Sequence, residues 1–220
     1  MTERSAAAST AFEQMNRMYR YQRYFYDATR KFYLLGRDRL IEKLEVASGQ
    51  NVLEVGCGTG RNLAILSARY PNAKFFGLDA SSEMLDTAAA KIDAAGLSNV
   101  FLKTALADSF GHASTFGLAE PFDSIFFSYS ISMIPPWRES LSNALANLRP
   151  GGTLYIVDFY DQRELPGWFR LILTGWLRKF HVQFWGDLIP HLVELDRQGI
   201  GNLEIASVAR RYAFIASLKT

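Results

Sequence analysis

The sequence has little cysteine, little net charge and no long apolar run, and each shortage excludes a class of protein. Its 220 residues include one cysteine, so no internal disulfide can form, which favours a reducing compartment. A net charge of +2 is too small for a general nucleic-acid-binding surface. No apolar run reaches the ~18–20 residues of a membrane-spanning helix. The Ala- and Ser-rich first ten residues lack the hydrophobic core of a secretory signal, so secretion is not expected.

Apolar strands alternate with helices along most of the chain. Strands are expected, in chain order, at residues 51–55, 74–78, 100–103, 122–129, 153–159, 203–208 and 212–218. Helices are expected at residues 61–70, 81–95, 137–148 and 188–198, and a loop at 109–121. Ser81 suits the N-cap of the second of these helices, and Gly96 suits its stop. This order predicts an α/β fold, a seven-stranded, mostly parallel sheet with helices on both faces and an antiparallel edge.

A glycine loop follows the first expected strand. The segment from residue 51 to 60, NVLEVGCGTG, is a buried strand that ends in Glu54 and Val55 and continues into glycines at alternate positions. Glycines let a ligand approach the backbone closely and bring it to the free N–H groups of the next helix. The second strand ends in Asp79, whose carboxylate is placed to hold a ribose diol. The two features predict a nucleoside-cofactor site on a doubly wound sheet.

The glycine spacing indicates which cofactor. In a dinucleotide fingerprint the third glycine comes one residue later than Gly60 does here. The form E-x-G-x-G-x-G, together with residues 79–85 (DASSEML), resembles class I S-adenosylmethionine (SAM) methyltransferases. That resemblance implies a Rossmann-like methyltransferase fold with SAM as cofactor and S-adenosylhomocysteine as product. The cofactor contacts it implies are Glu54, Gly56, Gly58 and Gly60 at the methionine end, Asp79 at the ribose, Ala80 and Met84 beside the adenine, and further contacts from Leu106 and Ser128.

One position departs from the pattern of this class. Many members carry an acid after the third strand that contacts the adenine amino group, whereas residues 105–108 here read ALAD. Either Asp108 takes this role from an offset position or the backbone does. By contrast, residues 148–154 (LRPGGTL) resemble the turn that precedes the fifth strand in the class, and this turn serves chain reversal alone.

Two segments bear on which molecule accepts the methyl group. Residues 12–45 look helical, with eight Lys or Arg against five Asp or Glu, and combine an arginine face with an aromatic face. We expect residues 1–45 to form a helical cap that contacts membrane, and residues 46–220 to form the SAM-binding domain. Residues 165–180 are rich in Trp, Leu and Phe with a narrow polar stripe. The first segment suits either an anionic membrane surface or a helix packed on the sheet. The second suits a helix in the head-group region, a lid over a lipid substrate, or a buried helix.

A narrower resemblance covers nearly the whole chain. Residues 26–38 (YDATRKFYLLGRD) and 128–135 (SYSISMIP) are similar to the bacterial betaine-lipid N-methyltransferases. That family implies three SAM-dependent methylations of diacylglyceryl-homoserine, a peripheral position on the cytoplasmic membrane face, and a partner enzyme that supplies the lipid. Three rival readings stay open: a phosphatidylethanolamine N-methyltransferase, a small-molecule enzyme such as a quinone methyltransferase, and a SAM-binding subunit without activity.

The reaction itself points to candidate residues. The enzyme must align a neutral amine with the methyl group, so each ammonium must first lose a proton. The quaternary ammonium product is stabilised by aromatic faces. Tyr24, Tyr26 and Tyr129 are the catalytic candidates, and Tyr33 is a candidate wall for the substrate. Arg30 either holds the homoserine carboxylate or pairs with Asp27, and His181 is a third substrate-binding candidate. No cluster has metal-ligand spacing, so no metal is predicted.

Overall fold

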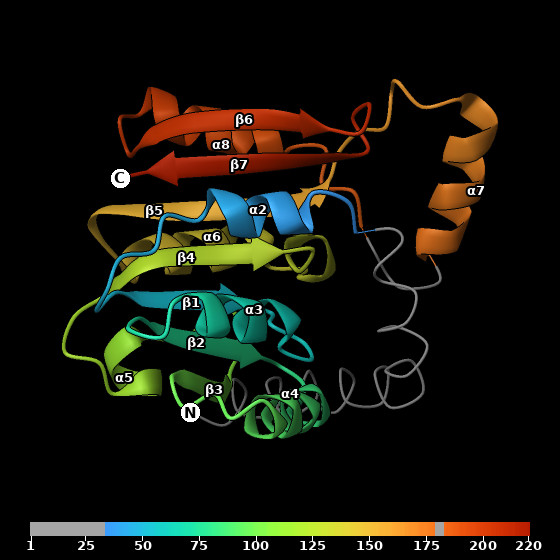
Figure 1. The fold of residues 1–220 in the computed structure, drawn as a ribbon. Helices are drawn as coiled ribbons and strands as arrows, with labels where there is room; N and C mark the ends of the chain where they lie inside the picture. Colours follow the sequence, from blue (N-terminus) through green and yellow to red (C-terminus); the bar gives the residue numbers. More distant parts are fainter. Residues whose placement is uncertain (1–33, 179–182) are drawn as a thin grey trace, which may run out of the picture.

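The computed structural model describes residues 34–178 and 183–220, which form one seven-stranded sheet with helices packed against it (Figure 1). The strand order is β3-β2-β1-β4-β5-β7-β6. Strands β1 to β5 run parallel, and β7 runs antiparallel to both β5 and β6. The strands are β1 (Asn51–Val55), β2 (Lys74–Asp79), β3 (Val100–Thr104), β4 (Phe122–Ser128), β5 (Leu148–Phe159), β6 (Asn202–Val208) and β7 (Ala213–Lys219). The predicted α/β fold is confirmed.

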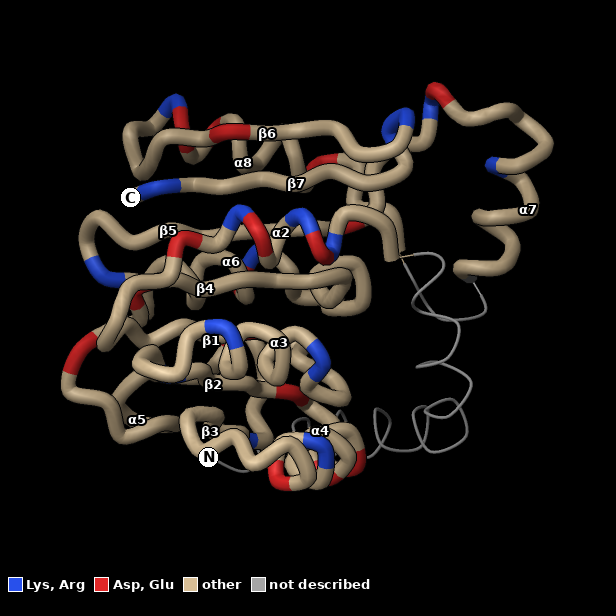
Figure 2. Tube along the Cα trace, viewed as in Figure 1, with Lys and Arg blue, Asp and Glu red and all other residues tan. Residues whose placement is uncertain are grey.

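The strand order reverses between β1 and β4, and this reversal fixes where a ligand can bind. Chain order proceeds outward from β1 through β2 to β3 on one side, and from β4 to β5 on the other. The loops after β1 and β4 therefore leave in opposite directions and open a crevice at the carboxyl ends of the strands. The central strands are almost entirely buried, and Figure 2 shows few charges along them. Continuous apolar strands of this kind are typical of a parallel sheet covered on both faces.

Two hydrophobic cores lie on opposite faces of the sheet. One face is covered by α2 (Arg37–Lys43), α3 (Arg61–Arg69) and α4 (Ser82–Ala94), whose buried side chains include Leu40, Leu63 and Leu85. The other is covered by α5 (His112–Phe116), α6 (Trp137–Ala146) and α8 (Leu188–Arg197), with Leu141 and Leu192 fully buried. A doubly wound sheet needs both layers because each face of a parallel sheet is apolar.

The ends of α4 form as the sequence predicts. The Ser81 hydroxyl accepts a hydrogen bond from the Met84 backbone N–H at 3.3 Å, which satisfies one of the free donors of the first turn. After the helix, Gly96 takes a left-handed conformation with φ of 66°, which suits a glycine stop.

Two predictions differ from the structure. The expected loop at 109–121 contains the short helix α5, because Asn147 on the neighbouring connection accepts a hydrogen bond from the His112 N–H at its start. The turn expected at 149–152 lies inside β5, which begins at Leu148 and pairs there with Phe122. The register with β4 shifts before Ser124 pairs with Thr153, so the intervening residues bulge out of the ladder instead of ending it.

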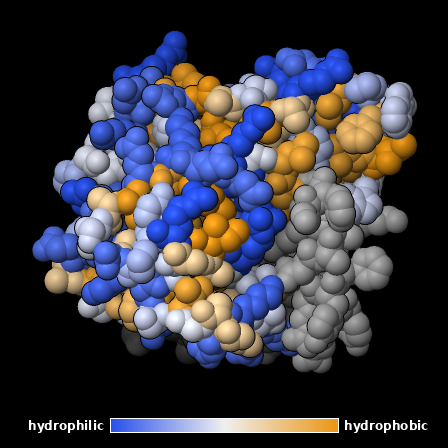
Figure 3. Space-filling model, viewed as in Figure 1, coloured by the Kyte–Doolittle hydropathy of each residue, from blue (hydrophilic) through white to orange (hydrophobic). Residues whose placement is uncertain are grey.

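Helix α7 (Gly167–Arg178) stands at the carboxyl edge of the sheet (Figure 1). It buries Leu173 and Leu177 in the same core as α2 and α3. Its opposite face carries Trp168, Leu171 and Ile172, which are 68%, 79% and 66% exposed. Hydrophobic residues accordingly gather over α7 on the surface (Figure 3). Within the part of the chain that the structure covers, no helix is long and apolar enough to cross a bilayer.

Candidate active site

The glycine loop between β1 and α3 is shaped by left-handed backbone and by tight packing. Gly56, Gly58 and Gly60 have φ of 72°, 54° and 73°, a region that L side chains rarely adopt. A Cβ on Gly56 would lie 2.5 Å from the Cβ of Ser130, and one on Gly60 would lie 2.9 Å from the Cβ of Ala88. Both contacts are too close, so glycine is required at these two positions for space as well as for conformation.

Backbone hydrogen bonds tie the loop to the end of β2. The N–H groups of Gly56 and Cys57 both donate to the Leu78 carbonyl, at 2.8 and 3.0 Å. The Asp79 carboxylate accepts from the Gly58 N–H at 2.8 Å and from the Ser81 N–H at 2.9 Å. In doubly wound folds an acid at the end of this strand is the one that binds a ribose diol. The buried acid therefore fixes the loop at the edge of the sheet where a ribose is expected.

A small cavity of about 40 Å³ lies beside the loop. Its wall contains both charges and hydrogen-bonding groups, from Arg37, Glu54, Thr59, Arg61, Asn62 and Ser128. The Asn62 amide donates to Glu54 Oε1 at 2.7 Å and holds this buried acid in place. The Ser128 hydroxyl is buried and meets no hydrogen-bond partner among the described residues. Cations, an acid and a free hydroxyl together fit a zwitterionic amino-acid group, such as the methionine end of SAM.

Four of these cavity residues were not singled out as site residues from the sequence: Arg37, Thr59, Arg61 and Asn62. Asn62 lies in the first turn of α3, directly after the glycine loop, and this position is the one local signal that could have found it. Arg37 begins α2 and reaches the cavity only through the packing of α2 on the sheet, which no local pattern reveals.

The predicted adenine and ribose contacts lie at the same edge of the sheet. Asp79 ends β2, Leu106 follows β3, and Ser128 ends β4, so the parallel strands bring all three to one side. Met84 is buried in the first turn of α4, and Ala80 is partly exposed beside it. Asp108 is exposed on the turn after β3.

Tyr129 directly follows β4, and its N–H donates to the Val157 carbonyl of β5 at 2.8 Å. Its backbone is left-handed, with φ of 55°, and its ring packs edge-on against Phe159 with centroids 4.8 Å apart. Its hydroxyl donates to the Leu35 carbonyl. Burial, and next the negative charge of Asp158, raise the pKa of Tyr129 well above its ordinary value. The phenol therefore stays protonated at neutral pH.

The remaining predicted residues lie outside the described part of the chain. They are the catalytic candidates Tyr24 and Tyr26 and the substrate candidates Arg30, Tyr33 and His181. Their roles, like the membrane contact of residues 1–45, stay predictions.

A second, larger cavity of about 540 Å³ lies beyond Phe159. The end of β5, helix α7, residues 184–186 and the start of α8 form its walls. Phe159 belongs to this wall and also contacts Tyr129, while Ser128, the residue before Tyr129, lines the small cavity. The Tyr129–Phe159 pair thus connects the residues that line the two cavities.

Comparison with known proteins agrees with this geometry. A family model described as "Methyltransferase domain" matches residues 53–154. The chain has the fold of a class I SAM-dependent methyltransferase. The match runs from β1 to the middle of β5 and so includes Glu54, Asp79 and Ser128. The cofactor of this class is SAM, and the glycine loop, the Asp79 carboxylate and the small cavity fit it.

Relatives of this methyltransferase domain act on different compounds. The chain is 29% identical to the trans-aconitate 2-methyltransferase of Azoarcus sp. (strain BH72), over 62% of this chain and 53% of that protein. It is 30% identical to the demethylmenaquinone methyltransferase of Listeria welshimeri, over 63% of this chain and 56% of that protein. The chain thus spans about half the length of these curated relatives.

A solved structure, the DhpI-SAM-HEP complex, shares the methyltransferase fold. It superposes with a TM-score of 0.67 at 20% identity and covers 94% of this chain and 97% of that one. An identity this low reports the fold alone, so the acceptor has to be argued from this chain's own surface.

Proposed function

We propose that the protein transfers methyl groups from SAM to the amine of a lipid head group, diacylglyceryl-homoserine, at the inner face of the membrane. The observation that carries this proposal is the exposed apolar face of α7 at the carboxyl edge of the sheet, where the cofactor crevice opens. SAM, when bound, supplies the methyl group. The chain's own residues select and orient the amine.

The geometry of α7 favours a membrane surface over a soluble acceptor. Trp168, Leu171 and Ile172 are spaced three and four residues apart, so they share one face of the helix. Contiguous exposed apolar side chains mark interaction sites. A twelve-residue helix is too short to span a bilayer but suits one that lies in the head-group region. Lipid would then reach the cofactor crevice from the α7 side.

The aromatic walls support an amine acceptor. Phe159, Phe184 and Trp185 line the larger cavity. A quaternary ammonium gains roughly 0.5–2 kcal/mol from each aromatic face it contacts. Such faces stabilise the quaternary ammonium product, whose positive charge is permanent, and they exclude water from the amine.

The direct test is methyl transfer from labelled SAM to lipid vesicles, with the lipids resolved afterwards. Vesicles that contain diacylglyceryl-homoserine are expected to take up label, and the label should progress to the trimethyl form. Label in phosphatidylethanolamine alone would keep a lipid amine as acceptor and overturn the homoserine head group. No label in either lipid, with SAM still bound, would overturn the proposal in favour of another acceptor or of a SAM-binding subunit without activity.

A quinone is the second candidate acceptor. It is favoured by the relatives named demethylmenaquinone methyltransferase, which match 63% of this chain. Such an acceptor is methylated on a ring carbon and carries no amine. Offering demethylmenaquinone in the same vesicles separates the two, because label in the quinone and none in the amine lipids would replace the proposal.

A further inference from the structure

The larger cavity combines apolar walls with an excess of positive charge. Its lining contains three arginines, Arg163, Arg170 and Arg211, against one acid, Asp161. Aromatic and aliphatic side chains from residues 184–190 make up much of the rest of the wall. A cavity of this character suits an amphiphile with an anionic group, because the apolar part and the charge each meet their complement.

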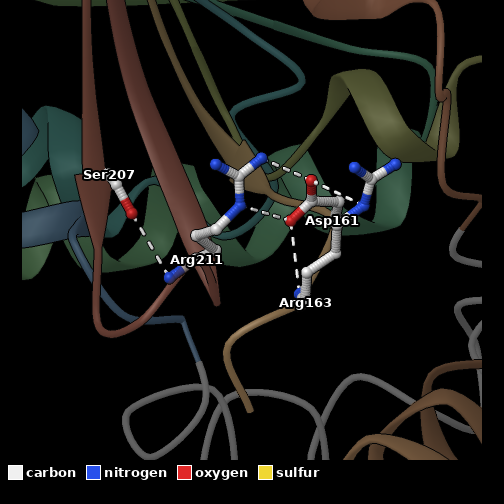
Figure 4. Close-up of polar contacts among 4 residues, drawn as sticks. All are labelled: Asp161, Arg163, Ser207 and Arg211. Atoms are coloured by element: carbon white, nitrogen blue, oxygen red, sulfur yellow. Dashed lines mark hydrogen bonds and ion pairs between the residues drawn. The ribbon is translucent and has the colours of Figure 1, made fainter.

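Two of the three arginines are already held in place (Figure 4). Arg211 donates from Nε to Asp161 Oδ1 at 2.7 Å and from its terminal nitrogen to Oδ2, while its guanidinium lies 4.0 Å from the centroid of the Tyr160 ring. Arg163 Nε lies 3.3 Å from Asp161 Oδ2. The hydrogen bond from Arg211 is the main cause that lowers the pKa of Asp161, so this acid is ionised at neutral pH.

Arg170 differs from this pair. It projects from α7 into the cavity lining, and its guanidinium makes no hydrogen bond or ion pair with any residue that the structure describes. Asp161 is the one acid in the lining, and it is already engaged by two arginines. The charge of Arg170 therefore remains available to a ligand.

A second observation in the same cavity points to a ligand independently. Gln162 lines the cavity and is only 2% exposed, yet its Nε2 meets no hydrogen-bond acceptor among the described residues. Its backbone is fixed in a left-handed conformation, with φ of 56°, by a hydrogen bond from its N–H to the Arg211 carbonyl. Buried amide donors without an acceptor are uncommon in folded proteins. A ligand oxygen in the cavity would satisfy this one.

We propose that this cavity is the acceptor site, and that Arg170 and Gln162 Nε2 together bind the anionic group of an amphiphilic acceptor. The group is a carboxylate or a phosphate, and the apolar part of the acceptor lies along Trp185 and Ile189 toward α7. This inference rests on the proposed function. It adds a specificity determinant to it, because an amine on the same head group would lie toward the Tyr129–Phe159 pair and the cofactor crevice.

The test is calorimetric titration of the full chain, loaded with S-adenosylhomocysteine, with three ten-carbon probes below their micelle concentrations. Decanoate carries a carboxylate, decyl phosphate carries a phosphate, and decanol carries no charge. The variants are Arg170→Gln, Arg170→Lys and Gln162→Met, and Arg197→Gln on the exposed face of α8 is the matched control.

At least one anionic probe should bind the wild type more tightly than decanol does. Its affinity should fall about tenfold or more in Arg170→Gln and in Gln162→Met, since each loses a hydrogen bond to a charged group. Arg170→Lys should recover part of it, and Arg197→Gln should leave it unchanged. Tighter binding of decanoate would indicate an amino-acid head group, and tighter binding of decyl phosphate would indicate a phospholipid. Equal binding of all three probes, or a parallel loss of decanol binding in the variants, would overturn the proposal.

These outcomes are separable from the proposed function. Anion binding that depends on Arg170, without methyl transfer to the homoserine lipid, would retain the site and reject that substrate. With transfer established, Arg170→Gln should raise KM for the lipid and leave SAM affinity unchanged. Transfer to the homoserine lipid with an unaltered KM would retain the function and reject the site.

Discussion

The two sides of the sheet's carboxyl edge are built in different ways. On the β1–β2 side, the site is made by backbone: glycines in left-handed conformations, N–H groups on the Leu78 carbonyl, and one acid, Asp79, that joins two loops. On the β5–β7 side, the walls are side chains from α7, residues 184–186 and α8. A cofactor that a whole class of enzymes shares is bound by the site made of backbone. An acceptor particular to one enzyme is bound by the site made of side chains. Variants on the two sides should therefore affect different ligands.

The largest effect is expected from Asp79→Ala. This change removes two charge-assisted hydrogen bonds to loop N–H groups and the acceptor for the ribose, so SAM affinity should fall by roughly 3–5 kcal/mol. Calorimetry with SAM measures it, and the exposed Asp108→Ala is the control. SAM affinity within a factor of three of the wild type would remove Asp79 from the site.

The second-largest effect is expected on the pH dependence of stability, through Asp158 near the end of β5. Its carboxylate accepts from the Ser132 N–H at 3.0 Å and from the Phe159 N–H at 2.7 Å. Burial is the main cause that raises its pKa to about 6. The folded state therefore keeps this proton over a pH range in which the unfolded state, with an ordinary aspartate pKa near ~3.9, has lost it.

The sign of the pH dependence follows from that difference. Stability from this group is fully present below the ordinary aspartate pKa and is lost as the pH rises through about 6. The loss is roughly 3 kcal/mol at about 1.4 kcal/mol per pKa unit. Urea unfolding from pH 4 to pH 7.5 should show this slope in the wild type and in the exposed Asp93→Asn, and a flatter curve in Asp158→Asn. Parallel curves for all three proteins would contradict the assignment.

Gly56 in the glycine loop and Gly49 before β1 form a matched pair that separates backbone strain from lost space. Gly56 and Gly49 both have left-handed φ, of 72° and 83°, but a Cβ on Gly49 meets nothing within 4 Å. Each change to alanine costs about 1–2 kcal/mol in conformation. Gly56→Ala should cost about 1–3 kcal/mol more because of its overlap with Ser130. Denaturant unfolding of the two variants measures the difference, and equal costs would show that the loop relaxes around the added methyl.

The smallest effect is expected on membrane binding. Replacing both Trp168 and Leu171 by Ser removes exposed apolar area from α7, so sedimentation with anionic vesicles should weaken about tenfold. The unfolding midpoint should not change, because neither side chain packs in the core. Val193→Ser, also exposed and apolar but on α8, is the control. Unchanged sedimentation would remove the membrane role of α7.

The difference between the β1–β2 side and the β5–β7 side also explains which features the sequence could predict. The bounds of β1, the Ser81 cap and the glycine loop follow from patterns within ten residues, and the structure has them as expected. The β5–β7 side depends on contacts between distant segments. The hydroxyl of Tyr129 meets the carbonyl of Leu35, and Arg211 meets Asp161, 50 residues away. No local spacing could indicate either contact, nor that α2 would bring Arg37 to the cofactor cavity.

The most direct measurement is mass spectrometry of lipid extracted from vesicles after incubation with the protein and SAM bearing a deuterated methyl group. The vesicles contain diacylglyceryl-homoserine, phosphatidylethanolamine and demethylmenaquinone together, so the three acceptors compete at one surface. Our account predicts successive additions of up to three labelled methyl groups to the homoserine lipid and a sharp reduction in Asp79→Ala. Label confined to the quinone, or absent from every lipid while SAM still binds, would contradict it.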